Sequence, residues 1–233
     1  MTGGMVWYLV GGVAVVALLG LLLYWLLVTT EGVYLGRRVV IWLYDLTAQR
    51  YDKIKEYDAG DERYLVTRPL LNALQGISEP RVLDVATGTG RVPFNLLQSP
   101  RFTGQFVALD DSQRMLDVAR RKLAPYEGRV QLKRHPAVPL PFPDAHFDAV
   151  TCLEALEFFP SDEAAIKEMA RVLGHGRYLF LTRRRGWEGK LFLRRYRSRE
   201  TLRAMLEDAG LQQIQFHPWQ VNYDLVTALK IDR

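Results

Sequence analysis

The residues with the clearest chemical signal stand in the stretch VLDVATGTG, which runs from Val82 to Gly90. It is a run of β-forming residues that passes through an acid, Asp84, and ends in small residues and glycines. Small residues at a strand end allow main-chain amides to approach a ligand that a Cβ would obstruct, and a following helix offers its N-terminus. Because glycine also makes ordinary turns, the stretch alone indicates a ligand-binding loop only weakly.

The spacing around the glycines narrows the type of ligand. A dinucleotide fingerprint, G-x-G-x-x-G, would need a third glycine where Pro93 follows Gly88 and Gly90, and no G-x-x-x-x-G-K-[ST] loop occurs. Twenty residues past Gly90, a second β-forming run ends at Asp110. An isolated acid there is commonly a solvated turn residue, but after such a loop it is placed to accept both hydroxyls of a ribose. The combination predicts an adenosine-type ligand without a pyrophosphate.

These residues need a sheet that brings strand ends together. Beyond Pro80, near-continuous apolar runs alternate with amphipathic helical runs, which predicts a parallel sheet covered by helices on both faces. Ligands bind such sheets outside the carboxyl ends of the strands. A closing pair of runs with a short link is compatible with antiparallel strands. The expected strands are 81–85, 105–109, 130–133, 147–152, 178–182, 211–218 and 223–231, and the expected helices are 62–75, 91–98, 113–123, 162–173 and 199–209.

Four stretches in order carry a family resemblance. They are VLDVATGTG, VALDDSQRMLDVARRKL, LPFPDAHFDAVTCLEALEFFP and AIKEMARVLGHGRYLFLT. Together they resemble the motifs of class I S-adenosylmethionine-dependent methyltransferases, especially the small-molecule group that includes quinone and sterol enzymes. YDLTAQRYD, from Tyr44, resembles the YDxxAxxYD helix of that group. The resemblance implies an α/β, Rossmann-like, doubly wound sheet of seven strands in the order 3-2-1-4-5-7-6, with the seventh strand antiparallel.

The resemblance also implies S-adenosylmethionine as the cofactor. The residues expected to contact or shape its methionine end are Asp84, Ala86, Gly88 and Gly90, and Asp110 is expected on the ribose.

One family feature is missing at the adenine end. The family pattern GDAEALPFPD has an acid that touches adenine, but the aligned HPAVPLPFPD of this chain has Pro136 there. We therefore expect adenine to be held by Asp111, by the main chain or by an apolar neighbour.

Methyl transfer from a sulfonium is an in-line displacement, in which the protein aligns donor and acceptor and, where needed, removes a proton. The resemblance places two candidate bases near the donor, Glu154 and Glu157; the alternative is that both are exposed acids at a helix start. His135 and His146 are weaker candidates. No third ligand accompanies the two histidines, so no metal site is predicted.

An apolar run from Met5 to Val28 precedes this domain. Its 24 residues include three glycines and no charge, and as a helix they would cover roughly 36 Å, enough for a bilayer core. A cleaved signal peptide is disfavoured because the run is long, no Lys or Arg precedes it and VTTEG is a poor cleavage site. The basic residues that follow predict a single-pass membrane protein with a cytoplasmic C-terminal domain. They are Arg37, Arg38, Arg50, Lys53 and Lys55.

The expected organisation is a transmembrane anchor at 1–30, a juxtamembrane segment at 31–57 and a methyltransferase domain at 58–233. Residues 37–51, RRVVIWLYDLTAQRY, form either a helix along the bilayer surface or a cap on the catalytic domain. The composition, 48% apolar and 24% charged, is that of an ordinary globular protein. A single cysteine, Cys152, excludes an internal disulfide. It fits a reducing compartment, but the favoured interpretation is a buried core residue, which any compartment allows.

Positive charge is concentrated in residues 183–200, which hold eight basic and two acidic residues in a chain of net charge +5. Apolar residues between them suggest a loop that touches anionic headgroups and admits a lipid-soluble acceptor. The alternatives are a solvated charged face or RNA binding. No recognised nucleic-acid module accompanies the segment, so no nucleic-acid partner is predicted.

These features predict methyl transfer to a small, lipid-soluble acceptor, such as a quinone precursor, a pigment or a lipid, at the cytoplasmic membrane face. The alternative is a non-catalytic subunit of a membrane protein complex that retains the fold. The expected partners are therefore the bilayer, a hydrophobic acceptor and, for the alternative, a membrane complex.

Overall fold

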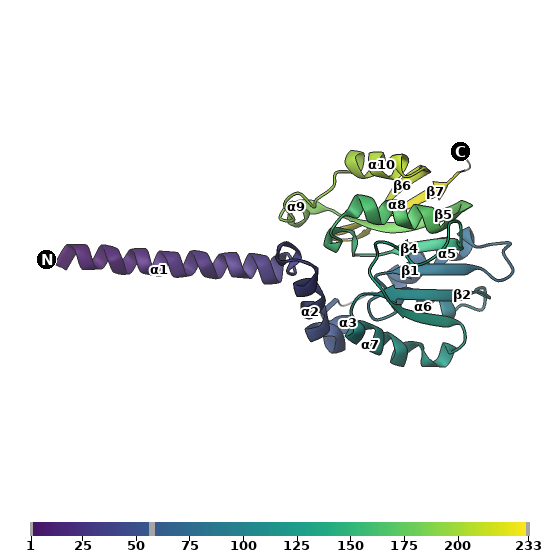
Figure 1. Cartoon of the computed structure of the whole chain (residues 1–233), viewed down its shortest axis with the longest axis horizontal. Coiled ribbons are helices and arrows are strands. Elements are labelled where there is room, and N and C mark those ends of the chain that lie inside the picture. Colours follow the sequence, from purple (N-terminus) through teal and green to yellow (C-terminus); the bar gives the residue numbers. More distant parts are fainter. Residues whose placement is uncertain (1, 56–58, 232–233) are drawn as a thin grey trace.

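A long helix projects from an α/β body in the computed structural model, which describes residues 2–55 and 59–231 (Figure 1). The helix α1, Thr2–Tyr24, continues into a π-helical stretch, Trp25–Thr29. The part from Trp7 to Thr29 is long and apolar enough to cross a membrane, and none of it is buried against the body. The expected apolar helix is therefore present and is separate from the core.

Short helices connect α1 to the body. A 3-10 turn, Val33–Leu35, leads into α2, Arg37–Thr47, and then a second 3-10 turn, Ala48–Arg50, leads into α3, Tyr51–Lys55. The helical expectation for 37–51 is confirmed. The domain boundary expected between residues 57 and 58 lies outside the described residues.

The body is built on a seven-stranded sheet in the order β3-β2-β1-β4-β5-β7-β6. β1, β2, β3, β4 and β5 run parallel, while β7 is antiparallel to both β5 and β6. The predicted order and the antiparallel seventh strand are confirmed. The strands are β1 Arg81–Val85, β2 Gln105–Asp110, β3 Val130–Arg134, β4 Phe147–Cys152, β5 Leu173–Arg184, β6 Leu211–Gln220 and β7 Tyr223–Lys230.

The largest difference from the expected bounds is in β5. The expected strand, 178–182, lies within a strand that begins at Leu173, because Leu173 already pairs with Phe147 across a register shift. Gly174 and Gly176 therefore lie inside β5.

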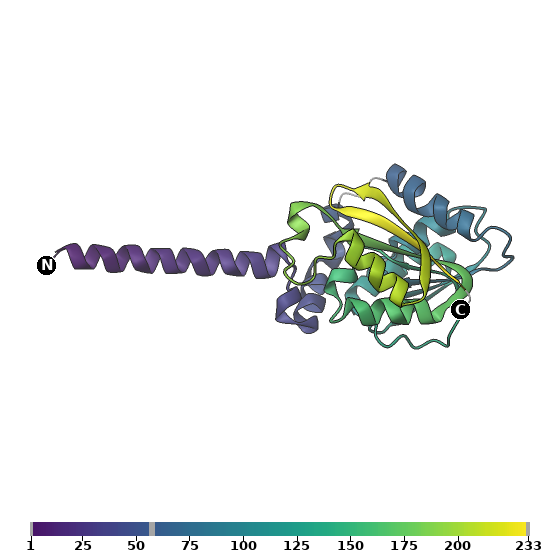
Figure 2. The ribbon, with the colours of Figure 1, turned by 90° about the horizontal axis from the view of Figure 1, so that it is seen from above.

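Helices cover both faces of the sheet (Figures 1 and 2). One face packs against α5, α6 and α7 through residues such as Leu70, Leu96 and Leu123. The other packs against α8 and α10 through residues such as Ile166 and Leu206. Burial of this apolar surface on both faces is the main stabilising contribution to the body. The helices are α4 Ala59–Glu62, α5 Arg68–Ala73, α6 Arg91–Leu97, α7 Gln113–Leu123, α8 Asp162–Val172, α9 Gly186–Gly189 and α10 Arg199–Asp208, with a π-helical stretch, Arg63–Thr67, between α4 and α5.

Candidate active site

A cavity of about 310 Å³, which we call the sheet-edge cavity, opens at the carboxyl ends of β1, β2 and β4. The sheet side of its wall comes from the glycine loop, the end of β2 and the chain after β4, and the opposite side comes from α2. This is the edge at which a parallel α/β sheet binds ligands.

The loop after β1 exposes its main chain to this cavity. Ala86 and Gly88 both have left-handed backbone conformations, with φ values of 56° and 55°. A Cβ added to Gly88 would meet no atom within 4 Å, because the space in front of it is open. Glycine therefore leaves room for a ligand here and avoids a strained conformation.

Asp110 lies at the floor of the same cavity. One carboxylate oxygen accepts the Gly88 amide at 2.8 Å and the other accepts the Ser112 amide at 2.8 Å. Burial raises the pKa of this carboxyl to about 6, although the two amide hydrogen bonds act in the opposite direction. The carboxylate keeps further lone pairs for hydroxyl groups of a ligand, as the ribose expectation requires.

Two of the expected cofactor residues lie behind the loop. Asp84 is buried and accepts hydrogen bonds from Thr87 at 2.6 Å and Thr151 at 2.5 Å. Burial raises its pKa to about 6, against the effect of these hydroxyl donors. Gly90 does not line the cavity: a Cβ there would lie 2.9 Å from Leu123. Asp84 and Gly90 are therefore placed to shape the loop, and Gly90 allows α7 to pack closely.

The residues expected near adenine, Asp111 and Pro136, both line the cavity. Arg37 of α2 forms an ion pair with Asp111, with one hydrogen bond of 2.7 Å. Pro136 lines the cavity together with Ala137 and Val138, which gives an apolar wall where the family has an acid. The apolar-neighbour option and Asp111 are thus both present at this end, but Asp111 is already engaged by Arg37.

The helix α2 has two different faces. Val40, Ile41 and Tyr44 line the cavity, whereas Trp42 and Leu46 on the outer face are more than half exposed. The cap interpretation of residues 37–51 therefore describes the inner face. The outer face retains the exposed apolar side chains that the bilayer interpretation requires.

Polar contacts fasten this cap to the body. Asp45 accepts the hydroxyl of Ser112, which caps the N-terminus of α7. Asp52 of α3 accepts the Thr89 hydroxyl at 2.6 Å and pairs with Lys122. The juxtamembrane helices thus hold the glycine loop from outside, a role that local sequence patterns did not indicate.

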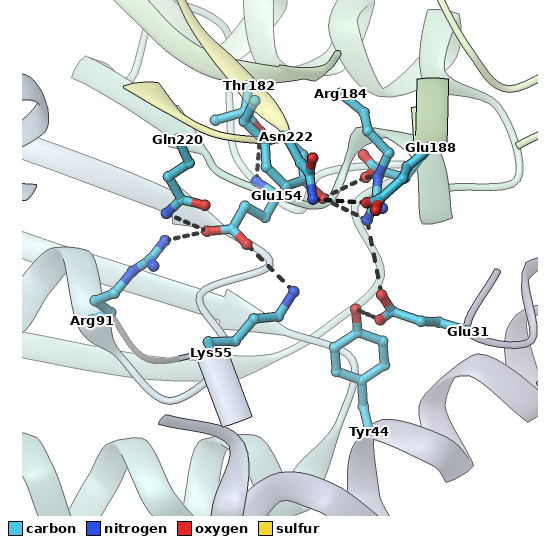
Figure 3. A network of polar contacts seen from close by, with 12 residues as sticks. Glu31, Tyr44, Lys55, Arg91, Glu154, Thr182, Arg184, Glu188, Gln220 and Asn222 are labelled. Atoms are coloured by element: carbon cyan, nitrogen blue, oxygen red, sulfur yellow. Dashed lines mark hydrogen bonds and ion pairs between the residues drawn. The ribbon is translucent and has the colours of Figure 1, made fainter. Parts of the chain in front are cut away.

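Tyr44 links the cavity to the base of α1. Its hydroxyl donates to Glu31 at 2.8 Å (Figure 3). Its ring packs against Tyr51 and Phe158 with centroid distances of 5.8 Å in each case. Burial, followed by the charge of Glu31, raises the pKa of Tyr44 well above its ordinary value. Tyr44 is therefore a neutral donor and an aromatic wall residue, and sequence reasoning missed both roles.

Glu154 is the predicted base that reaches the cavity. It has a left-handed backbone, with φ of 54°, and its amide donates to Thr182 at 2.6 Å. Its buried carboxylate pairs with Lys55 at 3.4 Å and with Arg91 at 3.0 Å (Figure 3). The turn thus aims this carboxylate between the glycine-loop helix α6 and the cap helix α3.

Glu157 lies elsewhere. It is not among the residues that line the sheet-edge cavity, and its carboxylate accepts from Arg184 at 2.7 Å and from the Tyr223 hydroxyl at 2.7 Å. The structure therefore places Glu157 in an ion-pair network on the β5–β7 side, and its role as a base stays a prediction.

No group of three potential metal ligands occurs among residues 2–55 and 59–231. His135 lines the sheet-edge cavity, and its Nδ1 lies 2.8 Å from the carbonyl of Pro136. His146 stacks on Phe142 at the far end of β4, and burial lowers its pKa.

Most of the arginines in residues 183–200 are engaged inside the body. Three of them, Arg183, Arg185 and Arg199, surround the buried Asp224 at 3.1 to 3.5 Å. Arg184 pairs with Glu157. The expectation that the whole segment faces headgroups is corrected: carboxylates distant in sequence neutralise much of its charge.

Known proteins of similar sequence are methyltransferases. A family model described as a methyltransferase domain matches residues 82–176. The ubiquinone/menaquinone biosynthesis C-methyltransferase UbiE of Pseudomonas putida is 31% identical over 207 residues, which cover 73% of this chain and 80% of that protein. A demethylmenaquinone methyltransferase of Bacillus licheniformis is 31% identical over 185 residues, covering 66% of this chain and 78% of that protein.

Solved structures show the same fold at lower identity. The cyclase SpnF superposes with a TM-score of 0.68 at 20% identity, over 83% of this chain and 96% of that one. A methyltransferase from Aquifex aeolicus has a TM-score of 0.61 at 20% identity, over 79% and 97% of the two chains.

Fold and site together define an α/β enzyme that binds a nucleoside-type cofactor at its sheet edge. The chain belongs to the class I S-adenosylmethionine-dependent methyltransferases, in the quinone-type group.

The residues present fit S-adenosylmethionine. The open space before Gly88, the main chain beside Ala86 and the carboxylate of Asp110 converge on one cavity. When bound, this cofactor supplies an electrophilic methyl group carried by a positively charged sulfur.

Proposed function

We propose that this enzyme methylates a lipid-soluble acceptor, an isoprenoid quinone precursor, at the cytoplasmic face of a membrane. The names of the related C-methyltransferases support the acceptor class. The exposed apolar helix α1 supports the location, and the basic residues that follow it support the orientation. The observation that carries the proposal is that α2, which is joined to α1 by only a π-helical stretch and a 3-10 turn, also forms one wall of the cavity.

The sheet wall binds and orients the cofactor in this proposal. Asp110 accepts the ribose hydroxyls through charge-assisted hydrogen bonds, and the main chain at Ala86 and Gly88 lies against the methionine end. Asp84 holds the loop in shape through Thr87. Pre-alignment of this kind lowers the barrier of an in-line displacement.

The opposite wall receives the acceptor. Ile41 and Tyr44 of α2 line the cavity, and Phe158 from the chain after β4 packs against the Tyr44 ring. Together they offer an apolar and aromatic surface that suits a flat ring with an apolar tail. Water is poorly accommodated on this surface, which favours an acceptor that partitions into lipid.

Glu154 is our candidate for the group that takes a proton from the acceptor. Its carboxylate is the predicted base that borders the cavity, and Lys55 and Arg91 fix its orientation. Methylation at carbon replaces a hydrogen, so a proton must leave the acceptor, and a positioned carboxylate can accept it.

Two measurements test this function. Calorimetric titration of the detergent-solubilised full chain with S-adenosylmethionine and with its demethylated product tests cofactor binding. Mass spectra of membrane extracts from cells with and without the protein test the acceptor, which should gain the mass of one methyl group. Cofactor binding without any methylated lipid-soluble product would instead favour the accessory-subunit alternative.

A further inference from the structure

A second cavity, of about 300 Å³, lies at the base of α1. Its lining includes Tyr34, Pro160 and three arginines of the turn that precedes α10, namely Arg194, Arg195 and Arg197. Two acids also line it, and each is paired: Glu157 with Arg184 and Asp162 with Arg197. Pro160 also lines the sheet-edge cavity. The two cavities therefore lie on either side of the same short segment after β4.

The positive charge of this second cavity is only partly neutralised. Arg197 pairs with Asp162 at 2.6 Å, and its remaining Nη1 group donates to the Arg194 carbonyl. Arg195 donates to the carbonyls of Glu157 and Phe159. Among residues 2–55 and 59–231, no carboxylate forms an ion pair with Arg194 or Arg195. Both guanidinium groups are therefore suited to an anion from outside.

The backbone of Arg194 is held in an unusual conformation. Its φ of 62° is left-handed, which is uncommon for a long side chain. Arg197 holds its carbonyl at 2.7 Å, and the Tyr34 hydroxyl holds the carbonyl of Leu193 at 2.8 Å. Backbone strain of this kind is concentrated at binding sites. The fixed turn leaves the Arg194 side chain exposed beside the cavity.

The cavity stands at the level where the apolar helix ends. Tyr34 follows the apolar stretch by five residues and stacks on Trp25, with a centroid distance of 4.9 Å. Both ribbon views place α9 beside this end of α1 (Figures 1 and 2). Leu193 and Trp187 flank the region with exposed fractions of 58% and 70%. Aromatic and basic residues together are typical of the headgroup layer.

We propose that this cavity binds the phosphate of an anionic phospholipid, with Arg194 and Arg195 as its ligands. Guanidinium groups bind phosphate oxygens through charge-assisted hydrogen bonds, and the neighbouring apolar side chains suit the acyl chains. The inference rests on the proposed membrane anchoring of α1. Because Arg195 also holds the main chain at Glu157 and Phe159, an occupied site would stabilise the wall that the two cavities share.

Native mass spectrometry of the full chain tests this site. The detergent-solubilised protein is mixed with equal amounts of phosphatidylglycerol and phosphatidylcholine, and the lipids retained are counted. We expect one retained phosphatidylglycerol, preferred about tenfold over phosphatidylcholine, and about a tenfold loss of that preference in Arg194→Gln/Arg195→Gln. The matched control is Arg38→Gln/Lys190→Gln, which removes the same charge from exposed positions outside the cavity and should keep the preference.

Several outcomes would overturn the proposal. Equal losses in the two double variants would mean a diffuse electrostatic attraction, and equal retention of both lipids would mean no headgroup site. Displacement of phosphatidylglycerol by a stoichiometric amount of inorganic phosphate would identify free phosphate as the ligand.

Two further readouts keep the result decisive. Arg194→Gln alone alters an exposed side chain and replaces the double variant if that variant does not fold. It should also lose preference for phosphatidylglycerol over phosphatidylcholine. The affinity for S-adenosylmethionine, measured on Arg194→Gln alone, should not change. A retained lipid without methyl transfer would support the lipid site and refute the proposed acceptor chemistry. Methyl transfer without a retained lipid would support the acceptor chemistry and refute the lipid site.

Discussion

One wall of the sheet-edge cavity belongs to the sheet edge and the other to the helices that follow α1. The two walls present different chemical groups. The sheet wall consists of main-chain amides, such as that of Gly88, and of carboxylates such as the half-buried Asp110. The helical wall consists of apolar and aromatic side chains, such as Ile41 and Tyr44. A polar, water-soluble cofactor suits the first wall and a lipid-soluble acceptor suits the second. Changes to the two walls should therefore affect different kinetic constants.

Glu154 stands where the two walls meet and should give the largest effect. Glu154→Gln keeps the size of the side chain but removes its basicity, so we expect kcat to fall about 100-fold. The affinity for S-adenosylmethionine should stay nearly the same. The comparison is Glu157→Gln, at a buried carboxylate outside the cavity, which should reduce kcat far less; the reverse order would make Glu157 the base.

Asp110 tests the sheet wall. Asp110→Asn removes the charge that strengthens two hydrogen bonds to the ribose, so we expect a loss of about 2.5 kcal/mol, or roughly 70-fold in Kd for S-adenosylmethionine. The KM for the acceptor should change little. Calorimetry measures the loss, and Asp117→Asn on the exposed face of α7 is the control. An unchanged Kd would remove Asp110 from the site.

Gly88 separates strain from steric exclusion. Gly88→Val places a side chain in the cavity and should weaken cofactor binding about twentyfold, while the left-handed φ also costs about 1 kcal/mol of stability. Gly128→Val provides a matched control, because its φ is 87° and its surroundings are equally open, but it lies away from the cavity. Both variants should lose similar stability, and only the first should lose affinity. Equal affinities would show that the loop does not contact the cofactor.

Acidic pH should weaken the same wall. Because the pKa of Asp110 is raised to about 6, the carboxylate that accepts hydroxyl protons is lost as the pH falls through that value. We expect Kd for S-adenosylmethionine to rise about tenfold between pH 7 and pH 5, and to be nearly flat in Asp110→Asn.

The raised pKa values of Asp84 and Asp110 affect the stability of the fold in the opposite direction. The folded chain holds these protons more tightly than the unfolded chain, whose aspartates have a pKa near 3.8, so this contribution to the free energy of unfolding falls as the pH rises from 3.8 to about 6. A pH-independent Kd in the native protein would contradict the assignment of Asp110.

The helical wall should give the smallest effect. Ile41→Ala removes apolar surface from the acceptor side, so we expect about a fourfold rise in the KM for the acceptor, equivalent to about 0.8 kcal/mol. Leu46→Ala, on the outer face of the same helix, is the control and should leave this KM unchanged. A rise in Kd for S-adenosylmethionine with an unchanged acceptor KM would reverse our assignment of the two walls.

The sheet wall could be predicted from the sequence, because its signals are local. A β-forming run, a glycine loop and an acid at the next strand end lie within thirty residues, and β1 and β4 have the bounds expected for them. The helical wall could not be predicted in the same way. The two faces of α2 both carry apolar residues, and only packing decides that Ile41 turns inward and Trp42 outward.

Two further differences have identifiable physical causes. The left-handed backbone at Glu154 is set by the tertiary hydrogen bond to Thr182, so the sequence could not distinguish Glu154 from Glu157. The basic segment appeared to be a free charged loop because its main partner, Asp224, is more than twenty residues away. Pairs that form only through β5–β7 contacts leave no local pattern.

The central claim is that the two walls of one cavity bind different molecules, S-adenosylmethionine at the sheet wall and a lipid-soluble acceptor at the helical wall. The most direct test incubates the full chain, in bilayers prepared from its host membranes, with S-adenosylmethionine that carries a deuterated methyl group. Mass spectrometry then follows the label. We predict that the label appears in a prenylated, lipid-extractable compound and that, at limiting S-adenosylmethionine, Asp110→Asn strongly reduces this labelling. Label that appears only in water-soluble products would contradict this account.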